Sequence, residues 1–276
     1  MRVQDSDRRV LGRRGASAAQ NGTASKNGAG RFPTVSVVIP ALNEAENLPH
    51  VLATLPGDIF ELVLVDGNSL DGTATVAQEH YPLVQIVGQP GRGKGDALAA
   101  GFAACTGDII VMMDADGSTD GGEIPRFVEA LVDGADFAKG SRFAAGGGSE
   151  DITPVRQAGN RLLCGLVNRL FHTSYTDLCY GYNAFWKRVL PEIRPDCAGF
   201  EVETLINIRA AVAGLRIVEV PSVEHCRIHG TSKLRPARDG LRVLKTILGE
   251  WRRDNSRSDP VPVDPMSASP ESSGIL

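Results

Sequence analysis

Two aspartates, Asp114 and Asp116, are the residues of this sequence best placed to do chemistry. They follow the apolar run 109–113, which has the pattern of a buried strand. Alternate residues of an extended chain point to the same side, so both carboxylates face one point at the strand's carboxyl end, where open α/β folds bind ligands. A divalent cation that carries a diphosphate would relieve their mutual repulsion. A solvated acidic turn is the alternative for such a pair taken alone.

The elements around this strand must bring further groups to the same edge. Apolar runs predict strands at 34–39, 61–65, 84–87 and 109–113, and the segments between them predict helices at 44–54, after 71–73, and at 96–104. Further along, we expect strands near 136–140 and at 215–220, and helices at 201–213 and 238–252. Strands alternating with helices indicate an α/β fold with a mostly parallel central sheet flanked by helices.

Composition and length limit the classes of protein to which this chain can belong. The chain has 276 residues, of which 42% are apolar, and this is enough for a sizeable core. A net charge of -4 excludes a global basic field for nucleic acid. Five scattered cysteines without a Cys-x-x-Cys pair predict neither disulfides nor a zinc site, and they fit a reducing cytosol. We expect no transmembrane helix and no secretion signal.

One domain is predicted, at 32–253, between two tails. Residues 1–31 are basic and lack periodicity, and residues 254–276 are rich in Ser, Pro and Asp, so both are expected to be disordered.

Polar motifs follow the first two strands as well. Residues 40–44 and 66–73 lie at the same predicted edge as the two aspartates. Glu44 and Asp66 can accept hydrogen bonds from a nucleobase and a ribose. Glu44 can also be a helix-dipole partner only, and residues 71–73 have the pattern of a turn with helix capping.

The glycine-rich segment 88–95 nearly matches a phosphate-binding loop, since it follows a strand and opens a helix. Gly95 stands where a Ser or Thr hydroxyl should hold magnesium, which argues against a nucleoside triphosphatase. A glycine-rich backbone with Lys94 near a diphosphate is the interpretation we keep, beside that of a flexible loop with a solvated lysine.

In order and spacing, segments 37–44, 65–73, 93–95 and 114–116 resemble glycosyltransferase family 2, which has the GT-A fold. The resemblance covers about residues 34–248. Gly67 departs from the family, which usually has a second acidic residue there, so the nucleobase stays open. Segments 140–143, 176–182, 200–203 and 227–234 resemble the polyprenyl-phosphate (dolichyl-phosphate) sugar transferase branch.

The resemblance implies a metal-dependent transferase that moves a sugar from a nucleotide-diphosphate sugar, of the GDP-mannose or UDP-glucose type, to a polyprenyl or dolichyl phosphate. It implies Mg or Mn held by Asp114, Asp116 and His229, and catalytic roles for Asp116, Arg142 and Arg227. It assigns the donor to Pro40, Leu42, Glu44, Asp66, Asn68, Lys94, Asp114, Ala115 and Lys233. It assigns the acceptor phosphate to Arg142, Arg156 and Asn160, the last in place of the usual Ser.

Several alternatives remain open. A family 2 enzyme can act on a small soluble acceptor, such as a secondary metabolite or a phosphoglycerate, and an alcohol would then need a base, with Asp177, Glu201 and Glu203 as candidates. A nucleotide-sugar-binding protein without catalysis is a further reading, against which the aspartate pair argues. Single arginines are often only surface salt bridges, and His229 is a metal ligand or a loop residue.

Two apolar stripes, at 162–171 and 241–251, have helical spacing and basic neighbours. Such helices can lie at a membrane interface, although a stripe of this kind is more often packed core, which we favour for the second helix. The basic N-terminal tail would add attraction to anionic lipid. We expect a cytoplasmic protein with peripheral contact at the inner face of the membrane and no nucleic-acid partner.

Overall fold

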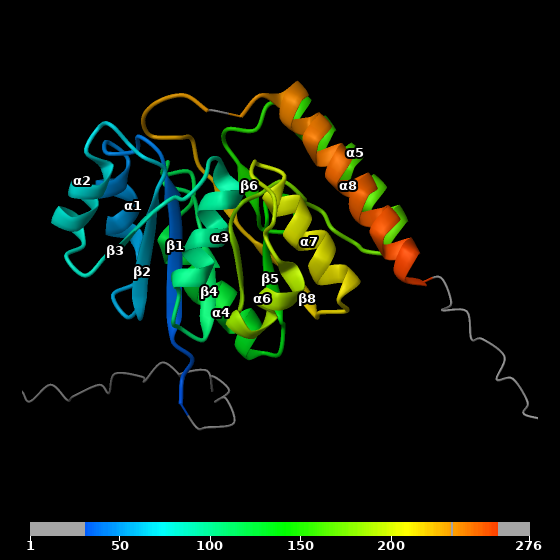
Figure 1. The fold of residues 1–276 in the computed structure, drawn as a ribbon, viewed down its shortest axis with the longest axis horizontal. Helices are drawn as coiled ribbons and strands as arrows, with labels where there is room; N and C mark the ends of the chain where they lie inside the picture. Colours follow the sequence, from blue (N-terminus) through cyan, green and yellow to red (C-terminus); the bar gives the residue numbers. More distant parts are fainter. Residues whose placement is uncertain (1–30, 233, 259–276) are drawn as a thin grey trace, which may run out of the picture.

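The computed structural model describes residues 31–232 and 234–258. A seven-stranded sheet with the strand order β3-β2-β1-β4-β7-β5-β8 forms the centre of this part (Figure 1). Its strands are β1 (Val35–Ala41), β2 (Glu61–Asp66), β3 (Gln85–Gly88), β4 (Ile109–Met112), β5 (Phe137–Ser141), β7 (Asn183–Trp186) and β8 (Ile217–Pro221). Neighbours are parallel except β7, which runs antiparallel to β4 and β5. The predicted α/β class with a mostly parallel sheet is confirmed, whereas β7 was not predicted.

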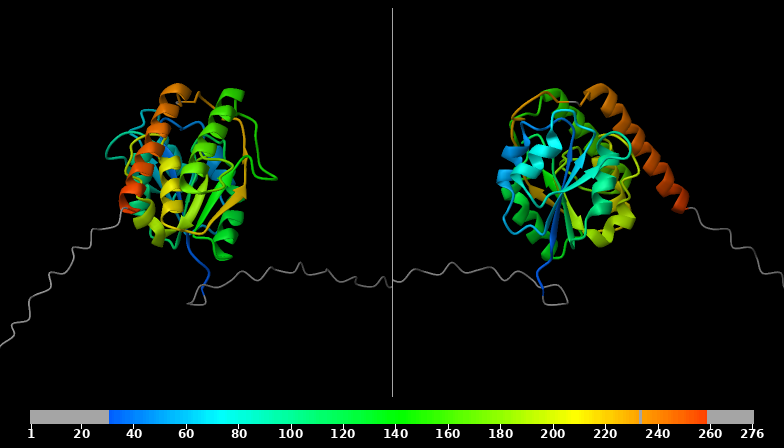
Figure 2. Two further views of the ribbon diagram at one scale, coloured as in Figure 1. Left: turned by 90° about the vertical axis from the view of Figure 1, so that its right-hand side faces the viewer. Right: turned by 60° about the vertical axis from the view of Figure 1, so that its left-hand side comes forward.

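Helices cover both faces of the sheet (Figures 1 and 2). They are α1 (Leu48–Thr54), α2 (Thr73–His80), α3 (Lys94–Ala104), α4 (Ile124–Val132), α5 (Pro154–Phe171), α6 (Leu190–Ile193), α7 (Val202–Val212) and α8 (Pro236–Ser258). Alternation along β1 divides the core: Val37 and Ile39 pack with α1, α2 and α4, while Val38 packs with α3, α6 and α7. The site-bearing loops at the carboxyl ends of β1 and β4 are thus anchored by strands buried on both sides.

A close helix–sheet contact requires a glycine in α3. A Cβ atom at Gly101 would lie 2.5 Å from a methyl of Val38 and 2.8 Å from a methyl of Val65. The absence of that Cβ brings α3, which begins with Lys94, down onto β1 and β2.

Helices α5 and α8 lie side by side along one flank of the molecule (Figures 1 and 2). Val167, Val243 and Ile247 are buried between these helices and α7, whereas Leu162 and Leu241 are 76% and 54% exposed. The predicted stripe of α5 therefore packs mostly into this core, whereas the core positions of α8 are Val243 and Ile247 and not the predicted stripe, of which Leu241 is exposed. No described helix is long and apolar enough to cross a membrane.

The helix predicted at 238–252 is longer than expected, because α8 runs through 254–258, the start of the predicted C-terminal tail. An ion pair between Arg253 and Glu250 and a hydrogen bond from Ser256 to the Arg252 carbonyl hold this last part. The helix expected at 44–54 begins at Leu48, after a turn. Of the predicted tails 1–31 and 254–276, residues 1–30 and 259–276 lie outside the described residues.

Candidate active site

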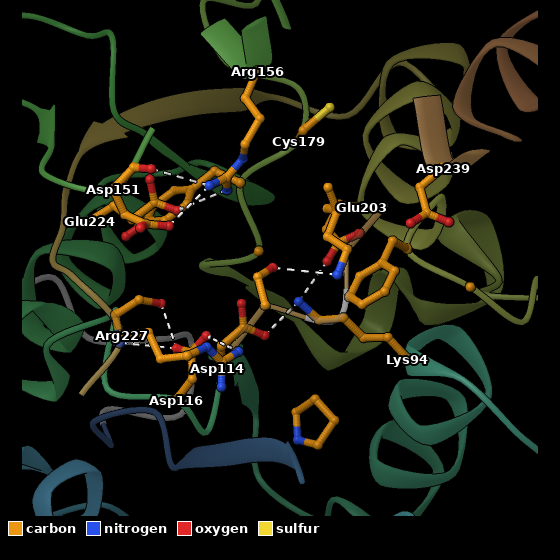
Figure 3. Close-up of a pocket in the computed structure, with 18 of the residues that line it drawn as sticks. Lys94, Asp114, Asp116, Asp151, Arg156, Cys179, Glu203, Glu224, Arg227 and Asp239 are labelled. Carbon is orange, nitrogen blue, oxygen red and sulfur yellow. Dashed lines mark hydrogen bonds and ion pairs between the residues drawn. The ribbon is translucent and has the colours of Figure 1, made fainter. Parts of the chain in front are cut away.

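One pocket of about 910 Å³ opens at the carboxyl ends of β1 and β4 and extends to α5 and α8 (Figure 3). The fold brings most of the predicted site residues into this single space. Those that line it are Pro40, Leu42, Glu44, Lys94, Asp114, Ala115, Asp116, Arg142, Arg156, Asn160 and Arg227. A pocket of this size can hold a nucleotide sugar.

Asp114 and Asp116 lie just beyond β4, as the strand register predicts, and each binds a basic side chain. Asp116 is 2.7 Å from Arg227, and its other oxygen accepts hydrogen bonds from the backbone N–H and the hydroxyl of Ser118. Asp114 is 2.5 Å from the Lys94 amine. Both carboxylates of the pair are thus bound to cationic side chains (Figure 3).

Lys94 is buried between two carboxylates rather than solvated in a loop. Its amine lies 2.7 Å from Glu203 of α7 as well as 2.5 Å from Asp114. Burial alone would lower the pKa of Lys94, but the charges of Asp114 and Glu203 outweigh it and raise that pKa. A Cβ at Gly181 would come within 2.7 Å of the amine, so this glycine lets the 178–182 loop lie against the cluster.

The three carboxylates considered as a base differ in burial, in hydrogen-bond partners and in access to the pocket. Asp177 is fully buried, and hydrogen bonds from Arg142 overcome its burial and lower its pKa. Glu201 accepts a hydrogen bond from the Gly199 backbone and does not line the pocket. Glu203 does line it, and burial raises its pKa, with Lys94 opposing and Asp114 adding to that shift. Glu203 is therefore the candidate with both access and a raised pKa.

Arg142, at the end of β5, is held by two carboxylates. Its Nε and Nη2 donate to Asp177 at 2.7 and 3.0 Å, and its Nη1 donates to Glu224 at 3.1 and 3.0 Å. The guanidinium also stacks over the Tyr180 ring, 5.0 Å from its centroid. All three nitrogens thus have acidic partners, and the side chain is only 3% exposed. The geometry suits a residue that fixes the surrounding loops.

Arg156 and Asn160 of α5 have freer polar groups. Arg156 is 24% exposed and pairs at 3.0 Å with Asp151, which is itself 44% exposed. Asn160 is 3% exposed, and its Oδ1 accepts hydrogen bonds from the backbone of Leu178 and Cys179. These bonds fix the amide, and its Nδ2 has no hydrogen-bond partner within the described ranges.

Three further predicted site residues are Glu44, His229 and Lys233. Glu44 binds Arg227 at 3.2 Å and Asn47 at 2.6 Å. The His229 backbone pairs with Asn47, and its ring lies 5.9 Å from the His50 ring. In the part of the chain that is described, no group of three or more His, Cys, Asp or Glu side chains could hold a metal as arranged, so a three-residue ligand set is not preformed. Lys233 lies outside the described residues.

Asp66 and Asn68 lie apart from the large pocket. Asp66 accepts hydrogen bonds from the Ser69 backbone within its own turn. Asn68, in the left-handed conformation with φ 65°, lines a smaller cavity beside Gly67 and Gln89. The turn assigned to 71–73 is found as expected, with Asp71 accepting from the backbone and hydroxyl of Thr73.

Sequence reasoning missed the acidic partners of the arginines. Glu224 lies on β9 (Val223–Glu224), which pairs with β6 (Gly148–Ser149), and two-residue strands carry no periodicity to detect. Asp151 stood in a stretch for which no element was predicted, and Gln89 stood in the glycine-rich segment 88–95, of which only Lys94 was singled out as a ligand contact. Glutamine after a strand at the ligand-binding edge was the available signal for Gln89.

The model of the family described as glycosyl transferase family 2 matches residues 36–206. An uncharacterized glycosyltransferase of Mycobacterium tuberculosis is 35% identical over 219 residues, which are 79% of this chain and 96% of that protein. A dolichol-phosphate mannosyltransferase of Pyrococcus furiosus is 33% identical over 210 residues, which are 73% of this chain and 59% of that longer protein.

Among solved structures, glucosyl-3-phosphoglycerate synthase of M. tuberculosis in complex with phosphoglyceric acid is similar, with a TM-score of 0.64, 25% identity and coverage of 80% of both chains. The same enzyme with Mn²⁺, UDP and phosphoglyceric acid gives a TM-score of 0.63 at 25% identity, covering 79% of this chain and 78% of that one. These neighbours fit the small-acceptor alternative better than the polyprenyl-phosphate reading, which they do not confirm.

Proposed function

This chain belongs to glycosyltransferase family 2 and has the GT-A fold, and from that premise we propose that it moves a hexose from a nucleotide-diphosphate sugar to a small acceptor that carries a phosphate group. The observation that carries the acceptor class is the Asn160 amide: the residue lines the pocket beside Arg156, and among the described residues its buried Nδ2 has no hydrogen-bond partner. Buried polar groups without a protein partner are rare, and a bound ligand is one explanation for them.

The donor diphosphate is assigned to the carboxyl end of β4. Asp114 and Asp116 would hold Mg²⁺ or Mn²⁺, since Mg²⁺ is often bound by one or two carboxylates together with substrate phosphates. Both carboxylates bind cationic side chains in the structure, which fits this role. When bound, the metal would offset charge on the leaving diphosphate. Similar enzymes crystallised with Mn²⁺ or Mg²⁺ and UDP support the assignment.

The acceptor phosphate is assigned to the Asn160 N–H and to Arg156. Arg156 pairs with the partly exposed Asp151 and lies 3.7 Å from Glu224, which also binds Arg142. A partly exposed pair such as Arg156–Asp151 is weak enough to be exchanged for a phosphate. Arg142 is assigned a positioning role, because its nitrogens already donate to Asp177 and Glu224.

A hydroxyl nucleophile must lose its proton during the transfer, and Glu203 is the proposed base. It lines the pocket, and its pKa is raised by burial, so it is a stronger base than an exposed glutamate. Lys94 holds its carboxylate in place at 2.7 Å. The proton goes from the acceptor hydroxyl to Glu203 as the oxygen bonds the anomeric carbon and the nucleoside diphosphate leaves.

A polyprenyl phosphate is the second candidate acceptor, favoured by the apolar end of the pocket. Side chains from α5, α8 and their flanking loops line that end: Ile152, Val155, Leu163, Leu234 and Val243. The relative named for dolichol phosphate supports this reading too. A phosphate nucleophile is already ionised at neutral pH and would not need Glu203 as a base.

Nucleotide release tests the proposal. The full chain with Mn²⁺ and a panel of UDP- and GDP-sugars should release nucleotide faster with 3-phosphoglycerate than with glycerate. Asn160→Asp keeps the oxygen that binds the loop but replaces the donor with a charge, so it should raise the acceptor KM at least about tenfold. The control Gln157→Glu makes the same change on α5 outside the pocket and should leave that KM unchanged.

Each other outcome has a defined meaning. Equal stimulation by glycerate and 3-phosphoglycerate would contradict phosphate recognition. Stimulation by a short polyprenyl phosphate alone would select the second candidate. Absence of donor turnover with every acceptor would refute both.

A further inference from the structure

A second cavity, of about 340 Å³, adjoins the large pocket at the carboxyl ends of β1, β2 and β3. Leu42, Gln89 and Gly93 line both spaces, so the two are neighbours. In the sheet order, β1, β2 and β3 lead away from β4, the strand that presents the proposed diphosphate site. If the proposed function holds, the nucleobase end of the donor therefore reaches this cavity.

The described lining of this cavity contains no carboxylate. Three nearby aspartates are engaged in backbone turns instead. Asp66 accepts from Ser69, Asp71 accepts from Ala45 and Thr73, and Asp96 accepts from the Gly91 backbone at 2.8 Å. Guanine presents an N–H and an amino group side by side, and a carboxylate is the best acceptor for this pair of donors. The described lining of the cavity contains no carboxylate for this role.

Gln89 occupies the place where an acidic side chain at position 67 would project. A Cβ on Gly67 would lie 3.1 Å from Gln89 Oε1, so the glycine and the glutamine fit each other. Gln89 Nε2 donates to the Gly93 carbonyl at 2.7 Å, and this fixes which end of the amide is oxygen. Among the described residues, Oε1 accepts no hydrogen bond, and one Nε2–H remains.

The cavity therefore offers the Gln89 oxygen as a fixed acceptor, the second Nε2–H and the guanidinium of Arg92 as donors, and the Asn68 amide as either. Uracil has one N–H donor between two carbonyl acceptors, and Leu42, 41% exposed, adds an apolar surface for its ring. Guanine has two adjacent donors, and in the described lining they would find only neutral side-chain acceptors, the amide oxygens of Gln89 and Asn68. We propose that the donor nucleotide is a uridine diphosphate sugar and that Gln89 recognises uracil through hydrogen bonds to the edge of the base.

Binding of the bare nucleotides tests this without reference to turnover. Calorimetric titration of the full chain with UDP and with GDP, each with Mn²⁺, should give a Kd for UDP about tenfold lower, a difference of about 1.4 kcal/mol. Gln89→Ala should weaken UDP binding about 3- to 10-fold, which is the range for one or two lost hydrogen bonds, and should reduce the UDP preference. Pyrophosphate binding should be unaffected by the substitution. The matched control is Gln85→Ala, an exposed glutamine at the start of β3, the strand after which Gln89 follows.

The possible failures are distinguishable. GDP binding as tightly as UDP, or more tightly, would overturn the uracil assignment and leave the proposed transferase function intact. A UDP preference that survives Gln89→Ala unchanged would overturn the role of Gln89. Failure of both nucleotides to bind would instead count against the proposed function itself.

Discussion

Replacement of Lys94 by methionine measures how much the positive charge of Lys94, which lies between two buried carboxylates, contributes to stability. The amine lies 2.5 Å from Asp114 and 2.7 Å from Glu203, and its side chain is 12% exposed. Methionine fills similar space without the charge, so two carboxylates would lose their shared partner. Removal of one member of a buried ion pair costs about 3–5 kcal/mol. At about 2–4 °C per kcal/mol for a domain of this size, Lys94→Met should lower Tm by roughly 6–20 °C.

The deficit should depend on pH in a defined direction. Burial raises the pKa of Glu203 even with Lys94 present, and loss of Lys94 raises it further. A group whose pKa is higher in the folded than in the unfolded protein stabilises the fold below its unfolded pKa, and this stabilisation is lost as pH rises through its folded pKa. The Tm deficit of Lys94→Met should therefore be smaller at pH 5 than at pH 8.

Thermal unfolding followed by circular dichroism between pH 5 and pH 8 measures both effects. Adding Glu203→Gln to the Lys94→Met variant removes one of the two carboxylates that have lost their basic partner, and it should restore part of the decrease in Tm. Lys245→Met, at an exposed lysine of α8, serves as the control and should leave Tm unchanged. The reasoning would be refuted by a Lys94→Met protein that unfolds at the wild-type temperature, or by a deficit that is equal at pH 5 and pH 8.

Three further predictions concern turnover and packing. Asp116→Asn should reduce nucleotide release at least about 100-fold while Tm changes by only a few degrees, and retained turnover would contradict its metal-binding role. Glu203→Gln should abolish the rise of kcat with pH for a hydroxyl acceptor, because the base must be ionised to act; a pH–rate profile like that of the wild type would exclude Glu203 as the base. Gly101→Ala should destabilise by about 1–3 kcal/mol through its contacts with β1 and β2, while Gly165→Ala, on an open face of α5, should stabilise by up to about 1 kcal/mol. Urea unfolding compares the two variants, and equal effects would contradict the close-approach argument.

The parallel part of the fold could be predicted because its strands are continuous apolar runs. Residues 62–65 and 109–113 are buried on both faces of the sheet, and they are all Val, Ile, Leu or Met. β7 escaped prediction because Asn183–Trp186 is short and begins with a polar residue. Its place between β4 and β5 is set by long-range pairing, which local pattern does not encode.

The site likewise contains features that local sequence pattern predicts and features that depend on long-range contacts. Strand-end register was enough to place Asp114, Asp116 and Glu44 in one pocket. The partners of the basic residues could not be found by spacing, since Lys94 meets Glu203, and Arg142 meets Glu224, only through the tertiary fold. Arg142 was thus predicted to be a phosphate clamp, although its nitrogens are bound to carboxylates in the structure.

The charge of the pocket gives a physical reason for a metal requirement. Among the described residues, seven carboxylates and five basic side chains line the pocket, so its formal charge is negative before any ligand binds. The basic groups closest to the two aspartates, Lys94 and Arg227, are already paired with them. A pocket of this kind repels a diphosphate unless a divalent cation enters with it or before it. Donor binding should therefore weaken sharply in the presence of EDTA, whereas a pocket with unpaired lysines and arginines would bind the diphosphate without metal.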